Sequence, residues 1–357
     1  MSQICLGGVR LVCSAVLLLA GNAALGASFD CAKAQTPQEK AICDSPELSA
    51  ADDRMAAAYR AVLAVAPQEW ISEVHDDQGL WIRKMADGCP SKGLEPSTEL
   101  TVCLLADEDS RAKELQHMIL RESGVTFVWR SVHLSATADP GAEPIPGRPD
   151  PDPGTLHASW PQTKAGSPEW HAWNAAIEVA AYDLATETNG GPQPANGKPN
   201  WVVDPGMDIE VTVSLDAVSA QLATATIENN WYGHGAAHPN LNFTQLNWML
   251  KEKREMKPED IFRPNSGWET FLKNRCEKQV AAQLREEVGE DDPTVKNLPT
   301  ALYKIVRNPR SWELDGNGLE FSFEPYEVAC RACTPDPVKI SWAELKRYLQ
   351  PGFVIPK

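Results

Sequence analysis

The sequence predicts two domains: an N-terminal all-α domain built as a small disulfide-stapled helical bundle, then an α+β domain with a mostly antiparallel sheet. The chain has 357 residues, and the roughly 330 that follow an apolar N-terminal segment suit two domains. Apolar residues recur at helical spacing as far as residue 122, and alternating strand patterns mixed with helices follow. Four cysteines in the helical part form two closely spaced pairs.

Residues 1–27 have the three-part pattern of a secretory signal peptide. MSQICLGGVR carries one positive charge, LVCSAVLLLA is apolar, and small residues follow. Ala24 and Gly26 fit the cleavage rule, so the mature chain is expected to begin near Ala27 or Ser28. An uncleaved anchor is disfavoured by the short apolar run, and lipidation at Cys13 by the preceding Val12. We expect a periplasmic or secreted protein without a membrane span after cleavage.

Export makes disulfides the favoured state of most cysteines. Removing the signal peptide leaves seven of the nine cysteines, and in an oxidising compartment pairs are more often disulfides than metal or redox sites. Cys31 and Cys43 bracket a helix start in which Thr36 and Glu39 form a capping box. Cys89 and Cys103 are spaced similarly. We predict that each pair forms a structural disulfide, which we call a staple. A metal site or a redox site is the less favoured alternative.

The helical domain is expected to span residues 28–122. Helices are predicted from Ser45 to Pro67, around Trp81, and after Pro96, because apolar residues recur there every three or four positions. The quoted segments FDCAKAQTPQEKAIC, SPELSAADDRMAAAYRAVL, LWIRKMADGC and LTVCLLADEDSRAKELQ together resemble the LprI-type lysozyme-inhibitor domain. The resemblance implies an exported domain that inhibits c-type lysozyme, and it identifies no contact residue.

Residues 123–154 are predicted to form a strand, VTFVWRSVHLS, and a Pro-rich connector. The α+β domain then spans 155–357. It begins with a helix in SPEWHAWNAAIEVAAYDLA and a half-buried strand in MDIEVTVSL. Strands in LATATIENN and LNFTQLNWML flank a turn. A helix with Cys276 on its apolar side, a hairpin turning at DGNG, and a helix capped by Ser341 and Glu344 complete the domain.

The segments WYGHGAAHPNLNFTQLNWML, KPEDIF, GLEFSFEPYEVA and VKISWAELK are similar to the C-terminal domain shared by the anti-sigma factor RsiV and the deacetylase PdaC. In RsiV this domain binds lysozyme. In PdaC it accompanies a separate catalytic domain that this sequence lacks. The stretch GHGAAH departs from the family pattern by an additional histidine. The resemblance therefore implies a lysozyme-binding α+β domain without enzymatic activity.

The charge balance excludes nucleic acid as a partner. The formal net charge is −16, and loss of Arg10 with the signal peptide makes it −17. An acidic protein repels nucleic acid and anionic membranes and attracts basic partners, although acidity also serves solubility alone. No sequence motif for a nucleophile elbow, phosphate loop or zinc protease is present. We expect no catalytic residue, no cofactor and no metal.

Two polar motifs carry the remaining hypotheses. Tyr232, His234 and His238 lie in a Gly-rich turn, which favours either local hydrogen bonding or a partner-binding loop over a metal site. Cys330 and Cys333 form a C-x-x-C that precedes TPDP instead of a helix start, which disfavours redox catalysis. With Cys276, three cysteines remain, so one pair and one free thiol are expected without a defined pairing.

The two resemblances lead to one functional hypothesis. The protein is expected to bind, and to inhibit, c-type lysozyme in the cell envelope, with Tyr232, His234 and His238 as the candidate contact. The alternative is an envelope module that binds peptidoglycan or another glycan without cutting it. Twelve tryptophans would suit glycan stacking, but most lie on apolar faces and are expected in the core.

Overall fold

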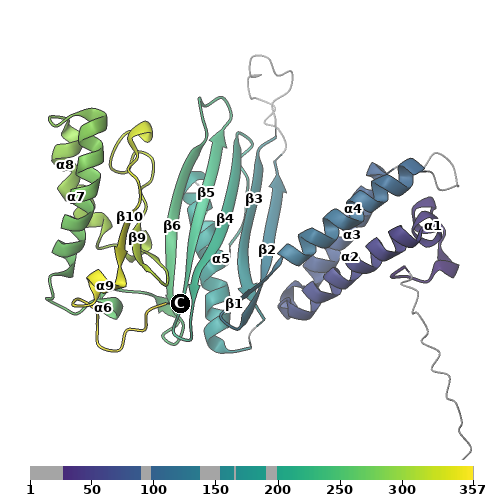
Figure 1. Cartoon of the computed structure of the whole chain (residues 1–357). Coiled ribbons are helices and arrows are strands. Elements are labelled where there is room, and N and C mark those ends of the chain that lie inside the picture. The colour runs from purple at the N-terminus through teal and green to yellow at the C-terminus, as the bar shows by residue number, and fades with distance from the viewer. Residues whose placement is uncertain (1–26, 90–97, 137–152, 165, 190–198, 357) are drawn as a thin grey trace, which may run out of the picture. The chain divides into compact units, whose positions relative to one another are not determined.

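A computed structural model describes residues 27–89, 98–136, 153–164, 166–189 and 199–356 (Figure 1). The predicted signal peptide up to residue 26 and most of the Pro-rich connector lie outside these residues. By compactness the chain divides into two units. The first comprises Met1–Ala58 and Gly79–Lys113, and the second comprises Tyr59–Gln78 and Glu114–Lys357. Within the described residues, no helix is both long and apolar enough to cross a bilayer.

The described residues of the N-terminal third include four α-helices: α1 (Pro37–Asp44), α2 (Pro46–Val65), α3 (Ile71–Gly88) and α4 (Thr98–His117). The capping box predicted at the start of α1 is confirmed. The Thr36 hydroxyl accepts a hydrogen bond from the amide of Glu39, and the Glu39 carboxylate accepts one from the amide of Thr36. These bonds satisfy amide groups that a helix start leaves without partners.

Both predicted staples are present in the first unit. Disulfides join Cys31 to Cys43 and Cys89 to Cys103. They flank a small core whose fully or almost fully buried members include Leu48, Leu100 and Leu104. Because a core of this size supplies little stability, closing two short loops in the unfolded chain is an effective way to stabilise it.

The second unit is built on a seven-stranded sheet with strand order β1-β2-β3-β4-β5-β6-β7. All neighbouring strands are antiparallel except β3 and β4, which are parallel. The strands are β1 (Ile119–Glu122), β2 (Val125–Ser135), β3 (Thr155–Thr163), β4 (Met207–Val218), β5 (Leu222–Gly233), β6 (Asn240–Met249) and β7 (Arg254–Glu255). The predicted, mostly antiparallel sheet is confirmed.

The structure differs from the sequence expectation at the end of the helical region. Residues 119–122 were expected to be helical, and they form strand β1 instead. Ser123 and Gly124 both have positive φ angles, 48° and 81°. Two consecutive residues with positive φ form a tight hairpin turn. The turn pairs Glu122 with Val125.

One face of the sheet is covered by helix α5 (Pro168–Asn189), which lies behind the strands in Figure 1. Trp173, Ile177 and Ala181 of α5 are fully buried against inward residues of the strands, including Ile209, Val211, Ala225 and Ile227. The alternation in β4 is as predicted: Ile209, Val211 and Val213 are buried, while the intervening residues are partly or fully exposed. The opposite face of β4 is therefore polar.

The C-terminal part of the second unit has its own core. Its elements are α6 (Pro258–Ile261), α7 (Trp268–Val288), α8 (Pro293–Ile305), β8 (Glu313–Leu314), β9 (Gly318–Phe321), β10 (Val338–Ser341) and α9 (Trp342–Leu345). Phe262 stacks on Trp268, and Trp312 meets both rings edge to face. Trp312 is fully buried and donates its indole N–H to the carbonyl of Val306. Trp160, Trp173 and Trp312 are thus core residues, as expected.

Candidate functional site

The candidate loop lies in the hairpin between β5 and β6. The chain reverses after Gly233, where the amide of Ala236 donates to the Gly233 carbonyl. Gly235 has φ +89°, a conformation that residues with a Cβ rarely adopt. The amide of His234 also donates to the carbonyl of Gly206 at 2.8 Å. The turn is therefore fixed to the preceding loop by backbone bonds.

Each of the three predicted contact residues has a local partner. The Tyr232 hydroxyl donates to the carbonyl of Ala236 at 3.0 Å. His234 Nε2 lies 3.1 Å from Asp208 Oδ2, and the His234 side chain is only 10% exposed. His238 is exposed, and its Nδ1 lies 3.0 Å from the carbonyl oxygen of Pro239. These contacts correspond to the locally hydrogen-bonded turn, and they leave Tyr232 partly exposed and His238 exposed at a rigid tip.

Asp208 is the charged support of this turn. Burial acts to raise the pKa of its carboxyl, but hydrogen bonds from Thr155 and His234 outweigh that effect and hold the pKa below its ordinary value. The Thr155 hydroxyl donates to Asp208 Oδ1 at 2.7 Å. Asp208 is consequently ionised at neutral pH and fixes the ring of His234 at the base of the turn.

The C-x-x-C segment contacts the same hairpin. Cys330 and Cys333 form a disulfide, and Cys276 is the free thiol, fully buried in the core of α7. This resolves the pairing that the sequence left open. Arg331, between the two bridged cysteines, donates to the carbonyl of Pro239 at 2.6 Å and lies 3.2 Å from His238 Nδ1. The disulfide loop therefore holds the hairpin tip through one guanidinium.

A polar face of the sheet extends from this hairpin. The register of the strands aligns one row of residues across five neighbouring strands and a second row across four. We call these rows the open face, and their members are His133, His157, Glu210, Asn230 and Leu241 in the first row, and Ser135, Thr155, Asp208 and Tyr232 in the second. Thr212, Glu228 and Phe243 add a third, shorter row.

The open face is negatively charged. Its three ionisable acids are Asp208, Glu210 and Glu228, of which the last two are exposed, and its rows contain no lysine or arginine. His133 and His157 stack with ring centroids 4.1 Å apart. Burial and the neighbouring His133 lower the pKa of His157, with partial opposition from Glu210. His157 therefore adds little positive charge at neutral pH.

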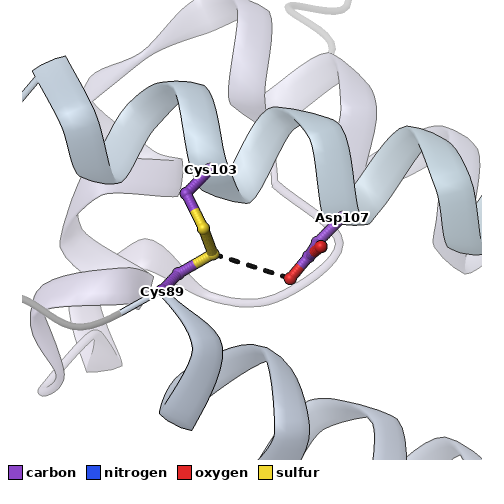
Figure 2. A group of neighbouring side chains, drawn as sticks. All are labelled: Cys89, Cys103 and Asp107. Carbon is purple, nitrogen blue, oxygen red and sulfur yellow. Dashed lines mark hydrogen bonds between the residues drawn. A yellow bond between two sulfur atoms is a disulfide. The ribbon is translucent and has the colours of Figure 1, made fainter.

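The described residues bring together one group of side chains with the geometry of metal ligands: Cys89, Cys103 and Asp107. Figure 2 shows Asp107 facing the disulfide, with its Oδ2 3.5 Å from Cys89 Sγ. Both sulfur atoms are used in the disulfide, so neither offers the thiolate that binds a metal. His234 and His238 are not part of this group.

Comparisons with known proteins find two families, in the order that the sequence suggested. Residues 31–115 match the family described as lysozyme inhibitor LprI, and residues 259–343 match DUF3298, a family described as a protein of unknown function. An LprI-type segment thus precedes a DUF3298-type segment in this chain. Neither family is described as an enzyme. The disulfides and the LprI match together indicate an extracytoplasmic protein.

Two solved structures of DUF3298 proteins are similar to this chain. One from Bacteroides fragilis is 16% identical, with a TM-score of 0.39, and the match covers 63% of this chain and 94% of that one. One from Pseudomonas aeruginosa PAO1 is 12% identical, with a TM-score of 0.43, and the match covers 64% and 95%. Both likenesses are too distant to bear on function. No curated protein matches the chain.

Sequence reasoning found the hairpin but missed the two features that surround it. The open face had a readable signal, because Asp208 and Glu210 alternate with apolar residues in MDIEVTVSL and so must share the polar side of the strand. The contact between Arg331 and the hairpin had none, since 92 residues separate Arg331 from Pro239.

Proposed function

We propose that this chain is an exported envelope protein, periplasmic or secreted, that binds c-type lysozyme and inhibits it. The observation that carries the proposal is the match of residues 31–115 to the lysozyme-inhibitor family. The acidity of the chain supports it, because a basic enzyme is steered toward a negatively charged partner. Steering accelerates the encounter, whereas inhibition requires a group that covers the substrate cleft.

The second unit supplies a candidate contact surface for this partner. The open face presents Glu210 and Glu228 to solvent without neighbouring basic residues in its rows. The hairpin tip adds Tyr232 and His238 on a backbone that is already fixed, so little conformational entropy is lost on binding. We assign the enzyme contact to the tip together with the adjoining acids.

The test combines a binding and an activity measurement on the oxidised full-length protein. Added protein is expected to slow the lysis of a Gram-positive cell-wall suspension by c-type lysozyme, and calorimetry at low salt should give a dissociation constant in or below the micromolar range. Binding is expected to weaken as salt rises, because exposed charges are screened. Absence of binding at micromolar concentration and low salt would remove the proposal.

Matched variants separate the function from the assigned surface. Two variants change the assigned surface. The first replaces Tyr232, His234 and His238 together by Ala, and the second replaces Glu210 and Glu228 together by Gln. Each is expected to weaken lysozyme binding at least about tenfold, which is a loss of roughly 1.4 kcal/mol. The control changes Glu286 and Glu287, two exposed acids of α7, to Gln and so alters net charge equally. Binding that survives both surface variants would keep the function and move the contact elsewhere. Binding to insoluble peptidoglycan without lysozyme binding would favour the glycan-binding alternative.

A further inference from the structure

A pocket of about 560 Å³ opens beside the start of helix α7, apart from the open face. Its walls are the loop from Arg263 to Gly267 and the side chains of Arg347 and Tyr348. The volume lies within the range of ordinary small-molecule sites, about 300–1,000 Å³. The lining contains two arginines and no carboxylate, which is unusual in a chain of net charge −16.

The two arginines differ from most others in this part of the chain. Five arginines nearby pair with carboxylates: Arg254 with Asp260, Arg275 with Glu344, Arg285 with Glu290, Arg307 with Glu269 and Arg310 with Glu255. Within the described residues, Arg263 and Arg347 have neutral partners only. Arg263 donates to the main-chain carbonyl of Arg347, and Arg347 donates to the Tyr348 hydroxyl.

The position of Arg347 is fixed by aromatic rings. Its guanidinium carbon lies 4.7 Å from the centroid of the Tyr348 ring and 5.8 Å from that of Phe271. Stacking of this kind orders the guanidinium but does not neutralise it. Two positive groups therefore line one pocket, one of them held in place, and no described acid balances either of them.

The start of α7 adds unused backbone donors beside the pocket, and the one acid of its first turn, Glu269, pairs with Arg307. The helix has 21 residues, and Gly267 at its N-cap, with φ +80°, provides no side-chain cap. The first amide groups of an uncapped helix keep unused hydrogen-bond donors and carry about half a positive charge in total. In the same loop, the hydroxyl oxygen of Ser266 is buried and has no hydrogen-bond partner within the described structure.

We propose that this pocket binds a small phosphorylated ligand, with Arg263 and Arg347 contacting its phosphate group. A guanidinium presents two parallel N–H donors to a phosphate, and such charge-assisted bonds are among the stronger polar contacts in proteins. The pocket is larger than a phosphate ion alone needs, so the remainder of the ligand occupies the space beside Tyr348. This assignment is independent of lysozyme binding.

The experiment titrates the oxidised full-length protein with inorganic phosphate and with glycerol 3-phosphate, and uses potassium chloride at equal ionic strength as the salt control. Both phosphates are expected to raise the melting temperature saturably and to shift the amide NMR signals of residues 267–270, and chloride is expected to do neither. Equal effects of phosphate and chloride, or shifts confined to other residues, would overturn the proposal.

Variants test the named side chains. Arg263→Gln is expected to weaken phosphate binding at least about tenfold, as for loss of one charge-assisted hydrogen bond. Arg347→Lys keeps the charge and the fold but loses the planar fork, so it should weaken binding with little change in the melting temperature of the free protein. Arg331→Gln, which removes a guanidinium outside the pocket, is the matched control. Unchanged phosphate binding in Arg263→Gln would refute the assignment.

Discussion

The helical part buries one glutamate, although ionisable side chains are rarely fully buried in proteins. Glu108 on α4 is 1% exposed, and one of its carboxyl oxygens has no hydrogen-bond partner within the described structure. Burial raises the pKa of Glu108 to about 8, and the negative charges of Asp52, Asp107 and Asp109 act in the same direction. Glu108 is therefore largely protonated at neutral pH, and ionising it costs stability.

This protonation gives a pH-dependent prediction. The pKa of Glu108 is higher in the folded chain than in the unfolded chain. The free energy of unfolding therefore has its full contribution from Glu108 below about pH 4.5 and loses it as the pH rises to about 8. The loss is at most about 1.4 kcal/mol per pH unit. Glu108→Gln keeps the neutral form, so the variant should be the more stable one at pH 8–9. Urea unfolding from pH 5 to pH 9 measures this. The exposed Glu99→Gln serves as control, and parallel curves for Glu108→Gln and the wild type would contradict the assignment.

At the scale of elements, the β5–β6 hairpin depends on a segment far away in sequence. Arg331 is the described link from the C-x-x-C loop to Pro239 and His238. The disulfide between Cys330 and Cys333 keeps this loop compact. Since the contact is exposed, its removal should change local order more than global stability.

We predict that Arg331→Ala accelerates hydrogen exchange at residues 234–239 and leaves the free energy of unfolding within about 0.5 kcal/mol of the wild type, as for other surface changes. Changing Cys330 and Cys333 together to Ser should have the same local effect, because the arginine then loses its fixed position. Arg307→Ala, which breaks an exposed ion pair with Glu269, is the control. Exchange at the hairpin that is unaffected by either change would show that the contact does not order the tip.

Local sequence patterns predicted most helices and strands and both disulfides of the helical part. They did not predict contacts between segments that are far apart in the sequence. Thr36 with Glu39 marked a helix start, and alternation marked β4, because these signals reside in neighbouring residues. No strand was predicted at residues 155–163. Pro161 within β3 is unfavourable for a strand, yet this residue pairs with Trp129 of β2. The polar side of β4 was readable from its alternation, but the rows of the open face and the lining of the arginine pocket combine residues that only the fold brings together.

At the scale of the whole molecule, the division into compact units does not follow the boundary expected after residue 122. The second unit includes Tyr59–Gln78 along with the sheet, and Arg130 of β2 connects the two. Its guanidinium forms two hydrogen bonds with Glu73, at 2.9 and 3.0 Å, and two with Glu178 of α5, both at 3.1 Å. It also lies over the ring of Trp70. Whether residues 28–122 fold alone stays a prediction.

Arg130 should therefore couple the unfolding of residues 59–78 to that of the sheet. Its side chain is 24% exposed and that of Glu178 is 22% exposed. Arg130→Ala therefore removes two charge-assisted hydrogen bonds from a carboxylate that is largely shielded from solvent, at a cost of about 1–3 kcal/mol. We expect earlier thermal unfolding, and hydrogen exchange in residues 59–78 that becomes faster than in β4 and β5. Arg54→Ala, which breaks an exposed ion pair with Asp109 inside the first unit, should cost no more than about 1 kcal/mol. If Arg130→Ala and Arg54→Ala behave alike, this arginine does not couple residues 59–78 to the sheet, and apolar packing remains as the interaction that would hold them there.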